Sequence, residues 1–338
     1  MCPQTLPSPN SPYQPYAKRY VDGPASGSTA AEIVKDLGLE GKLQDKVILI
    51  TGASAGLGHE TARALHTTDA KLYLIGRDLA EGQAVADGLV ASNPSGQKPV
   101  LIGLELSNLE SIRKAAKQFL DQQTRLDGRT IDGFETQLGT NYFGHFLLFH
   151  LIKSALLASG TSESPSRVIT LSSAGHKAGG VFFDDLDLSK QGYNLMVAYA
   201  QSKTATIHLA NFFDRHYSAS NIRAVSVHPG MIFETQLDRH MSQEELAAFA
   251  PMAPFARPTA QGASTTVWAA LDPHSRKHGG VYLADTGVSS AATEDEHFIG
   301  PGYAPHAYDE AAEERLWKLS YSVVGLRDDS DSISCSVC

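Results

Sequence analysis

Short apolar runs alternate with amphipathic segments along most of the chain. The runs are rich in Val, Ile and Leu, and they occupy residues 46–50, 71–75, 100–104, 167–171 and 223–228. Helical periodicity fills the spaces between them, with expected helices at 58–66, 78–91, 132–158 and 196–217. Continuous apolar strands that alternate with helices are typical of a parallel sheet covered on both faces. The pattern therefore predicts an α/β fold with a doubly wound parallel sheet in one domain, ending in a strand at 280–283.

Composition divides the chain into three parts. Residues 1–40 begin with a stretch rich in Pro, Ser and Gly, which is typical of a flexible lead-in. Residues 41–325 carry the alternating pattern and are expected to form the domain, and the acidic residues 326–338 are expected to be a disordered tail.

The overall composition excludes several classes of protein. Of 338 residues, 42% are hydrophobic and 19% are charged, so the chain can bury a sizeable core. The formal net charge of −9, without a basic stripe, argues against a nucleic-acid partner. The only cysteines are Cys2, Cys335 and Cys338, at the two ends, which excludes a disulfide framework and a cysteine-bound metal in the core. With no secretory signal pattern and no long uninterrupted apolar run, we expect a cytoplasmic protein without a bound metal.

A glycine-rich turn follows the first strand. The sequence TGASAGLG at 51–58 joins that strand to a helix, an arrangement in which backbone N–H groups and the helix N-terminus can hold a pyrophosphate. Such a turn can also simply connect a strand to a helix. Its position at the start of a βαβ pattern favours a dinucleotide site in a Rossmann-type sheet. The residues expected there are Gly52, Ser54, Gly56, Leu57 and Gly58.

The end of the second strand bears on the choice of cofactor. Enzymes that use NAD usually place an acid there to bind the ribose 2′-hydroxyl, but this chain has Gly76 followed by Arg77 and Asp78. Arg77 can pair with a 2′-phosphate, and Ser54 can assist it. We therefore predict NADP in preference to NAD. The alternative is that Arg77 and Asp78 are merely a solvated pair at a helix start.

A tyrosine and a lysine one helical turn apart are the strongest chemical motif. In the sequence YAQSK, Tyr199 and Lys203 are at positions i and i+4, so they share one face of the expected helix. A nearby cation favours the phenolate form and brings the pKa of Tyr199 closer to neutrality. This pair alone is common on ordinary helices. A second signal is the preceding strand, which ends in Ser172 and Ser173 at the edge where α/β sites form.

Together these motifs resemble the short-chain dehydrogenase/reductase superfamily, in particular its retinol-dehydrogenase-like branch and fungal relatives. The resemblance extends over about residues 40–325. It implies that Tyr199 is the general acid/base, that Lys203 modulates it and that Ser173 binds the substrate oxygen. In the segment GTNYFGHF at 139–146, it implies that Asn141 holds a water that relays protons from Lys203.

The resemblance also implies further cofactor contacts. Pro229 and Gly230 would form a turn beside the nicotinamide, with a backbone contact near Ile232. Thr235 would follow, although its distance from Gly230 is one residue longer than usual. Glu105 stands where the family usually has an aspartate near the adenine amino group. Asn141, Tyr199 and Lys203 complete the set of expected cofactor contacts. His145 and His228 are expected to be structural, because neither has a carboxylate at a spacing that would indicate a catalytic pair.

One part of the family pattern is absent from the sequence. After Leu126 and Asp127 the family normally continues with a central strand, an Asn-Asn-Ala-Gly turn and a loop, but here the apolar run is missing and the chain passes to Asp132. The fourth strand is thus expected to be missing. Three interpretations remain open: a lost exon fragment or splice variant, substitute pairing within the sheet, or a non-catalytic relic.

The resulting hypothesis is an NADP-dependent oxidoreductase that interconverts a carbonyl and an alcohol on a small, hydrophobic or secondary-metabolite substrate. The alternative is a non-catalytic or truncated dinucleotide-binding homologue with a regulatory role or none. A weaker possibility is membrane attachment, because Cys335-Ser336-Val337-Cys338 fits a prenylation outline, but its acidic surroundings favour a plain tail. An oligomer is compatible with the sequence.

Overall fold

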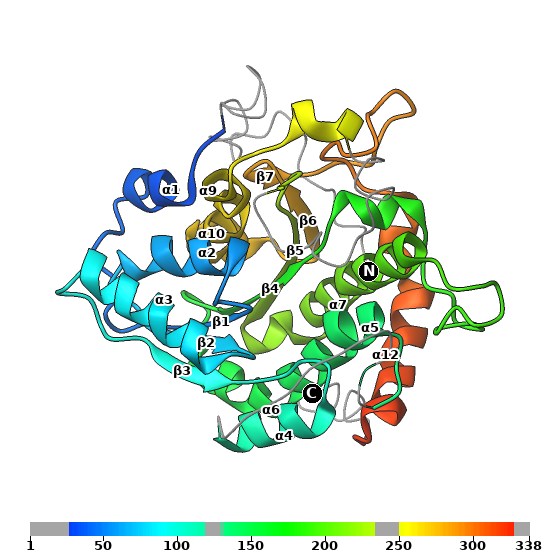
Figure 1. The fold of residues 1–338 in the computed structure, drawn as a ribbon, viewed down its shortest axis with the longest axis horizontal. Coiled ribbons are helices and arrows are strands. Elements are labelled where there is room, and N and C mark those ends of the chain that lie inside the picture. Colours follow the sequence, from blue (N-terminus) through cyan, green and yellow to red (C-terminus); the bar gives the residue numbers. More distant parts are fainter. Residues whose placement is uncertain (1–26, 119–129, 131, 234–249, 328–338) are drawn as a thin grey trace.

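The computed structural model describes residues 27–118, 130, 132–233 and 250–327. Its strands form two sheets (Figure 1). The first sheet has the order β1-β2-β3 and is wholly parallel: β1 (Val47–Thr51), β2 (Lys71–Gly76) and β3 (Val100–Gly103). The second has the order β4-β5-β6-β7: β4 (Ser166–Leu171), β5 (Ile222–His228) and β6 (Val281–Ala284) are parallel, and the short β7 (Gly287–Val288) is antiparallel.

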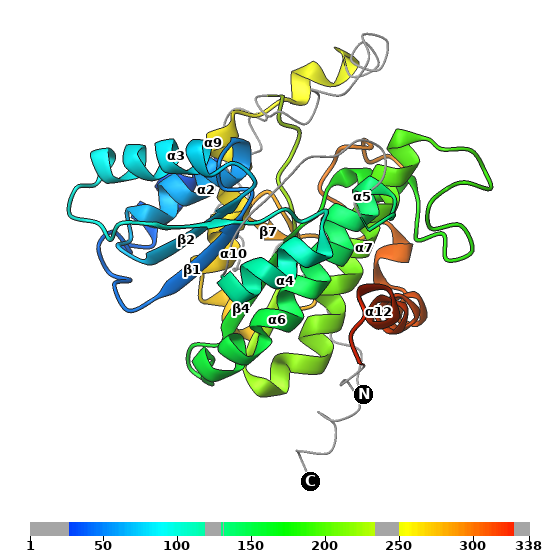
Figure 2. The same ribbon diagram turned by 60° about the horizontal axis from the view of Figure 1, so that its bottom comes forward.

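Helices cover both faces of the strands (Figure 2). One face carries α1 (Ala30–Asp36), α2 (Gly56–His66), α3 (Leu79–Ser92), α9 (Thr259–Gly262) and α10 (Ser264–Leu271), with α11 (His274–Lys277) following. The other face carries α4 (Leu109–Gln118), α5 (Thr136–Leu138), α6 (Gly144–Ser159), α7 (Leu195–Tyr217) and α12 (Glu310–Val324). Each face has its own buried apolar cluster. The prediction of a doubly wound parallel arrangement is therefore confirmed.

The region between β1 and β4 differs from the interior of the sheets. Within the part of the chain that the structure describes, no ladder joins β1 to β4. Val47 of β1 is 68% exposed and Leu171 of β4 is 38% exposed, values expected of edge strands rather than central ones. In the segment 126–133, where we expected a strand to be missing, residues 126–129 and 131 lie outside the described residues, so the loss of that strand stays a prediction.

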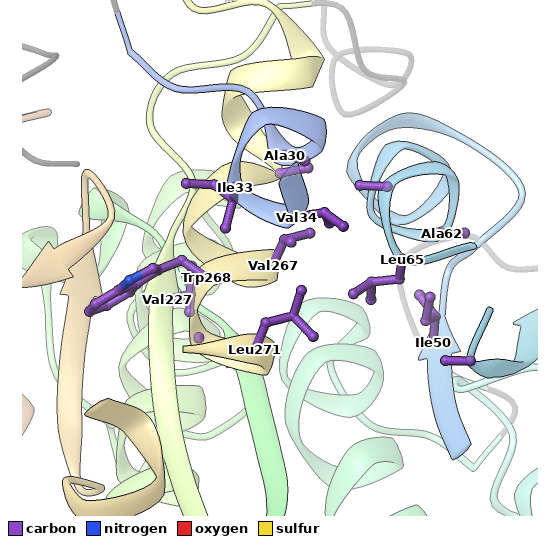
Figure 3. Packing of buried hydrophobic residues seen from close by; sticks show 14 of the residues in the cluster. Ala30, Ile33, Val34, Ile50, Ala62, Leu65, Val227, Val267, Trp268 and Leu271 are labelled. Atoms are coloured by element: carbon purple, nitrogen blue, oxygen red, sulfur yellow. The ribbon is translucent and has the colours of Figure 1, made fainter. Parts of the chain in front are cut away.

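The two sheets are nevertheless connected through helices. Ile33 and Val34 of α1 are fully buried and point toward Val267 of α10, with Leu65 of α2 close by (Figure 3). Helix α9 supplies a second connection at Gly262, where an added Cβ would lie 2.6 Å from Ile232 Cδ1 and 2.7 Å from Leu57 Cδ2. Leu57 follows β1 and Ile232 follows β5, so side chains from both halves of the molecule meet over this glycine.

Helix α1 corrects one expectation from the sequence. Residues 1–40 were expected to be a flexible lead-in, but 30–36 form a helix with a complete capping box, in which Thr29 and Glu32 satisfy each other's backbone N–H groups. Because α1 packs on α10, the folded domain begins before residue 41.

The expected helix at 132–158 is also more complex than its periodicity suggests. It starts at Thr136 and contains a π-helical turn, Gly139–Phe143, before α6 begins. The stretch Thr136–Ser159 is long and apolar enough to cross a membrane. Here Phe146 and Leu147 are completely buried in the core beside α7 and α12, so packing in the domain accounts for part of the apolar composition, while the end of α6 around Leu157 is exposed.

Candidate active site

The glycine-rich turn after β1 has the backbone that a phosphate site requires. Gly52 and Gly56 have φ values of +66° and +53°, a region that favours glycine. A Cβ on Gly58 would lie 2.2 Å from the carbonyl oxygen of Gly52, so only glycine permits this close approach of α2 to the turn. The turn therefore leaves a cradle lined by backbone at the N-terminus of α2, which suits a pyrophosphate.

Arg77 lies at the end of β2, beside the phosphate turn. A Cβ on Gly76 would be 3.6 Å from Ser54 Oγ, which places Ser54 next to the start of the Arg77 segment. Arg77 is exposed, and its Nε lies 3.9 Å from Oε2 of Glu105. Asp78 caps α3 by accepting from the N–H groups of Ala80 and Glu81, at 2.7 and 3.1 Å. The structure therefore gives Asp78 a capping role rather than a pairing with Arg77.

Glu105 follows β3 with a buried carboxylate. Its Oε1 accepts from the backbone N–H and the hydroxyl of Ser107, at 3.2 and 2.6 Å. Its Oε2 is buried and has no hydrogen bond from the described part of the chain, apart from the long ion pair to Arg77. A buried carboxylate oxygen with unused capacity fits a donor such as the amino group of an adenine.

Ser173 and Tyr199 are brought together at the end of β4. The Ser173 hydroxyl hydrogen-bonds the Tyr199 phenol, and this bond lowers the pKa of Tyr199 against the larger, opposite effect of burial. A Cβ on Gly175 would lie 2.8 Å from Tyr199 Cε1, so the glycine leaves room for the ring. Two residues expected from the sequence to act on one oxygen atom are thus in contact.

Lys203 lies one turn further along α7. Its Nζ donates to the carbonyl of Leu171 at 2.8 Å and lies 5.5 Å from the centre of the Tyr199 ring. Burial lowers the pKa of Lys203 to about 8. The ammonium is therefore held at the carboxyl end of β4, near the Tyr199 ring. Burial raises the pKa of Tyr199 in this structure, opposite to the lowering expected from the sequence.

Asn141 occupies the π-helical turn, a feature that is frequent at functional sites. Its amide nitrogen donates to Ser202 Oγ at 2.9 Å and to Gln137 Oε1 at 3.2 Å. Ser202 lies between Tyr199 and Lys203 on α7, so the structure places Asn141 beside the Tyr-Lys pair. Its backbone carbonyl is 3.1 Å from Nδ1 of His145.

His145 is a site neighbour that the sequence analysis treated as structural. Its Nε2 lies 3.1 Å from the Thr51 hydroxyl at the end of β1. Burial, with a further contribution from the charge of Lys203, lowers the pKa of His145 to about 4. The sequence could have indicated that His145 is near the site, because it follows Asn141 by four residues, which is one helical turn.

The turn after β5 completes the described site. Gly230 has a φ of +87°, and a Cβ on it would meet the side chain of Arg257 at 2.9 Å. Pro229 precedes it, and Ile232 contacts the Gly262 region opposite Leu57. Thr235, the least regular of the expected contacts, lies outside the described residues. The glycine-rich turn after β1 and the turn after β5 therefore meet at α9, an arrangement that fits a nicotinamide dinucleotide.

Comparison with known proteins places these features in a family. The sequence profile of the short chain dehydrogenase family matches residues 46–246. The oxidoreductase CalI of Penicillium decumbens is 38% identical over 327 residues, covering 89% of this chain and 94% of the relative. That alignment is longer than the part of this chain it covers, so the relative carries residues without a counterpart here.

A mammalian enzyme and a solved structure are also similar. Bovine retinol dehydrogenase 12 is 33% identical over 300 residues, covering 85% of this chain and 88% of the relative. The crystal structure of a putative uncharacterized protein from Mycobacterium paratuberculosis has a TM-score of 0.64 at 26% identity, covering 88% of this chain and 98% of that one. The chain is an oxidoreductase of the short-chain dehydrogenase/reductase family, in the retinol-dehydrogenase-like branch with its fungal relatives.

Proposed function

We propose that the protein is an NADP-dependent oxidoreductase that interconverts a carbonyl and an alcohol on a small hydrophobic molecule. The observation that carries this proposal is the contact between Ser173 and Tyr199, with the Lys203 ammonium one helical turn away. A bound nicotinamide supplies or accepts the hydride. In the direction of reduction, Ser173 donates a hydrogen bond to the substrate oxygen and Tyr199 delivers the proton to it.

The neighbouring groups support this proton transfer. Lys203 stabilises the phenolate that remains on Tyr199 after the proton has left, because a cation nearby favours the charged form. Asn141, beside Ser202, holds the route by which the proton is replaced from solvent. Since these groups are assembled in one place, we favour an enzyme over a non-catalytic homologue.

The preference for NADP rests on Arg77. Its guanidinium is exposed at the end of β2, and the preceding Gly76 lies beside Ser54, so Arg77 can form a charge-assisted pair with a 2′-phosphate there. The buried carboxylate of Glu105 lies 3.9 Å from the same guanidinium and weakens that preference by partly neutralising it.

A hydrophobic substrate is supported by side chains near the site. Large apolar residues that remain exposed include Met196, three positions before Tyr199, and Phe233, directly after Ile232. Phe255 is also exposed and stacks on His297, with ring centres 4.5 Å apart.

The cytoplasmic location expected from the sequence is kept as part of this proposal.

The substitution Tyr199→Phe tests the proposed chemistry. Native protein is incubated with NADPH and a panel of aromatic and aliphatic aldehydes and ketones, and NADPH oxidation is followed by absorbance. Loss of the phenol is expected to lower kcat by ~10²–10⁴, a typical value for general acid/base catalysis, and to leave the Kd of NADPH unchanged. A variant that keeps more than half the native rate contradicts the proposal.

A further inference from the structure

The peptide groups on either side of Ser173 are held by two buried imidazoles. His176 is completely buried, and its Nδ1 lies 2.7 Å from the carbonyl oxygen of Ser173. His228, at the end of β5, is 4% exposed, and its Nδ1 accepts from the N–H of Ala174 at 3.2 Å. Neither histidine belongs to the reacting set described above; His228 was expected from the sequence to be structural, and no role was predicted for His176.

Backbone partners fix the proton on each ring. The N–H of Ala304 donates to His176 Nε2 at 3.0 Å, and because an amide N–H only donates, Nε2 carries no hydrogen. The hydrogen of His176 is therefore on Nδ1, which donates to Ser173. His228 is the reverse case: Nδ1 accepts from Ala174, and the ring also bonds the backbone of Ile299. Burial lowers the pKa of His176 to about 3 and that of His228 to about 4, so both rings are neutral at physiological pH.

The second partner of each ring comes from one segment, residues 296–306, which we call the strap. Further bonds attach the strap to the turn after Ser173. Lys177 Nζ donates to Glu296 Oε1 at 2.6 Å and to the Gly300 carbonyl at 3.0 Å. His306 Nε2 lies 2.9 Å from the carbonyl of His176. The strap is thus anchored independently of Ala304, and it presents fixed backbone groups to the two rings.

We propose that His176 and His228 are positioning residues for Ser173: two neutral imidazoles that hold its carbonyl and the following N–H so that its hydroxyl meets Tyr199 and the substrate oxygen. This inference rests on the proposed roles of Ser173 and Tyr199. The hydroxyl depends on the turn because it accepts from the N–H of Gly175 at 3.0 Å as well as bonding Tyr199. A shift of the turn by ~1 Å is enough to lower the rate substantially.

Two substitutions separate the two bonds of His176. In His176→Asn, the side-chain amide nitrogen can replace Nδ1 as the donor to Ser173, while the bond from Ala304 is lost. In His176→Gln, the longer side chain can place its oxygen where Nε2 accepted from Ala304, while the donor to Ser173 is lost. We expect kcat within about threefold of native for Asn and a fall of about 10- to 100-fold for Gln, with the Kd of NADPH unchanged in both.

His208→Asn is the matched control. His208 is also buried, at 3% exposure, and its Nε2 lies 2.8 Å from the His306 carbonyl, so it contacts the strap and not the Ser173 turn. Its loss should lower the melting temperature as the His176 variants do, while kcat stays near native. Equal kcat values for His176→Asn and His176→Gln, or an equal fall in kcat for His208→Asn, overturn the positioning role.

A second measurement does not depend on turnover. Nitrogen-15 NMR of histidine-labelled native protein, with His176 and His228 assigned from their variants, reports which ring nitrogen carries hydrogen. We expect hydrogen on Nδ1 of His176 and on Nε2 of His228; the opposite tautomer or a charged ring at pH 7 overturns the proposal. If instead Tyr199→Phe keeps the native rate, the proposed function fails, and the NMR result still decides how the turn is held.

Discussion

The hydroxyl of Thr51 lies 3.1 Å from Nε2 of His145, and this contact joins the end of β1 to the helix that carries Asn141. Since Nδ1 of His145 faces the carbonyls of Thr140 and Asn141, it holds the hydrogen and Nε2 accepts from Thr51. This side-chain bond connects the first sheet directly to the neighbourhood of the residues proposed to be catalytic.

Removing the Thr51 hydroxyl should therefore destabilise the protein. In Thr51→Val the shape is retained, but Nε2 of the half-buried His145 loses its partner, which costs about 1–3 kcal/mol of unfolding free energy. Urea denaturation measures this value. The control is Thr67→Val at the end of α2, where the hydroxyl donates to the nearby Ala64 carbonyl at 2.7 Å within the same helix end. An equal loss of stability in both variants would show that the bond between Thr51 and His145 contributes no more to the unfolding free energy than the bond between Thr67 and Ala64.

Arg77 and Glu105 should have opposite effects on cofactor choice. Arg77→Ala removes the cation for the 2′-phosphate and should reduce the preference for NADPH over NADH about tenfold or more, in keeping with ~1.5–3 kcal/mol for a charged hydrogen bond. Glu105→Gln removes the negative charge 3.9 Å from Arg77 and should increase that preference. Dissociation constants for both cofactors provide the measurement. Equal affinity of native protein for NADPH and NADH would contradict this assignment.

Buried neutral histidines should make the protein sensitive to acid. Burial lowers the pKa of His145, His208 and His228 to about 4 and that of His176 to about 3, from a usual value of 6.5. Because the folded pKa values lie below the unfolded ones, the unfolded chain binds more protons as the pH falls. Their contribution is complete above about pH 6.5 and is lost as the pH falls toward 4, at up to ~3 kcal/mol for each ring.

Urea unfolding at pH 7.5, 6 and 5 tests this dependence. The unfolding free energy should decrease over the series, and His208→Asn should make the decrease shallower, since one of the four rings no longer titrates. An unfolding free energy that stays level between pH 7.5 and 5 would mean that the pKa values of these rings are not lower in the folded protein than in the unfolded chain.

The separation of β1 from β4 leads to a prediction about the sequence 126–132. We expect the chain as written to be poorly stable and weakly active, because buried backbone groups without partners cost ~1–3 kcal/mol each. A version with a typical family strand, turn and loop inserted between Leu126 and Asp132 should melt higher and turn over faster. Thermal unfolding and NADPH oxidation compare the two. Cooperative unfolding of the native chain above ~60 °C, with turnover at ~1–10³ s⁻¹, would show that it needs no such insertion.

The sequence predicted the buried strands of both sheets well. β2, β4 and β5 lie within one residue of the apolar runs, because the strands of a parallel sheet covered by helices are rich in apolar residues. Helix α1 was not predicted from the sequence, although its capping box can be recognised there. Its apolar residues, Ile33 and Val34, become a helix face only when they pack against α10, more than two hundred residues further along the chain.

The residues of the proposed site could be located from the sequence where the proposed chemistry rests on side chains. Ser173, Tyr199, Lys203 and Asn141 could be found because their types and spacing are distinctive, and the structure brings them together. His176 and His228 could not be found in this way. Their partners are backbone groups of Ser173, Ala174 and the strap, and a sequence does not show where a backbone N–H or carbonyl will lie.

The close approach of Leu57 and Ile232 over Gly262 has a thermodynamic consequence. In the described structure, the first sheet carries the glycine-rich turn after β1 and the second carries the turn after β5, the two proposed contacts of the cofactor, with helix packing rather than a shared ladder between the sheets. A dinucleotide that engages both turns would act as a crosslink between two weakly joined halves. Ligand that binds only the folded form stabilises it by mass action. The fraction of this enzyme that is folded in the cell should therefore follow the concentration of free cofactor.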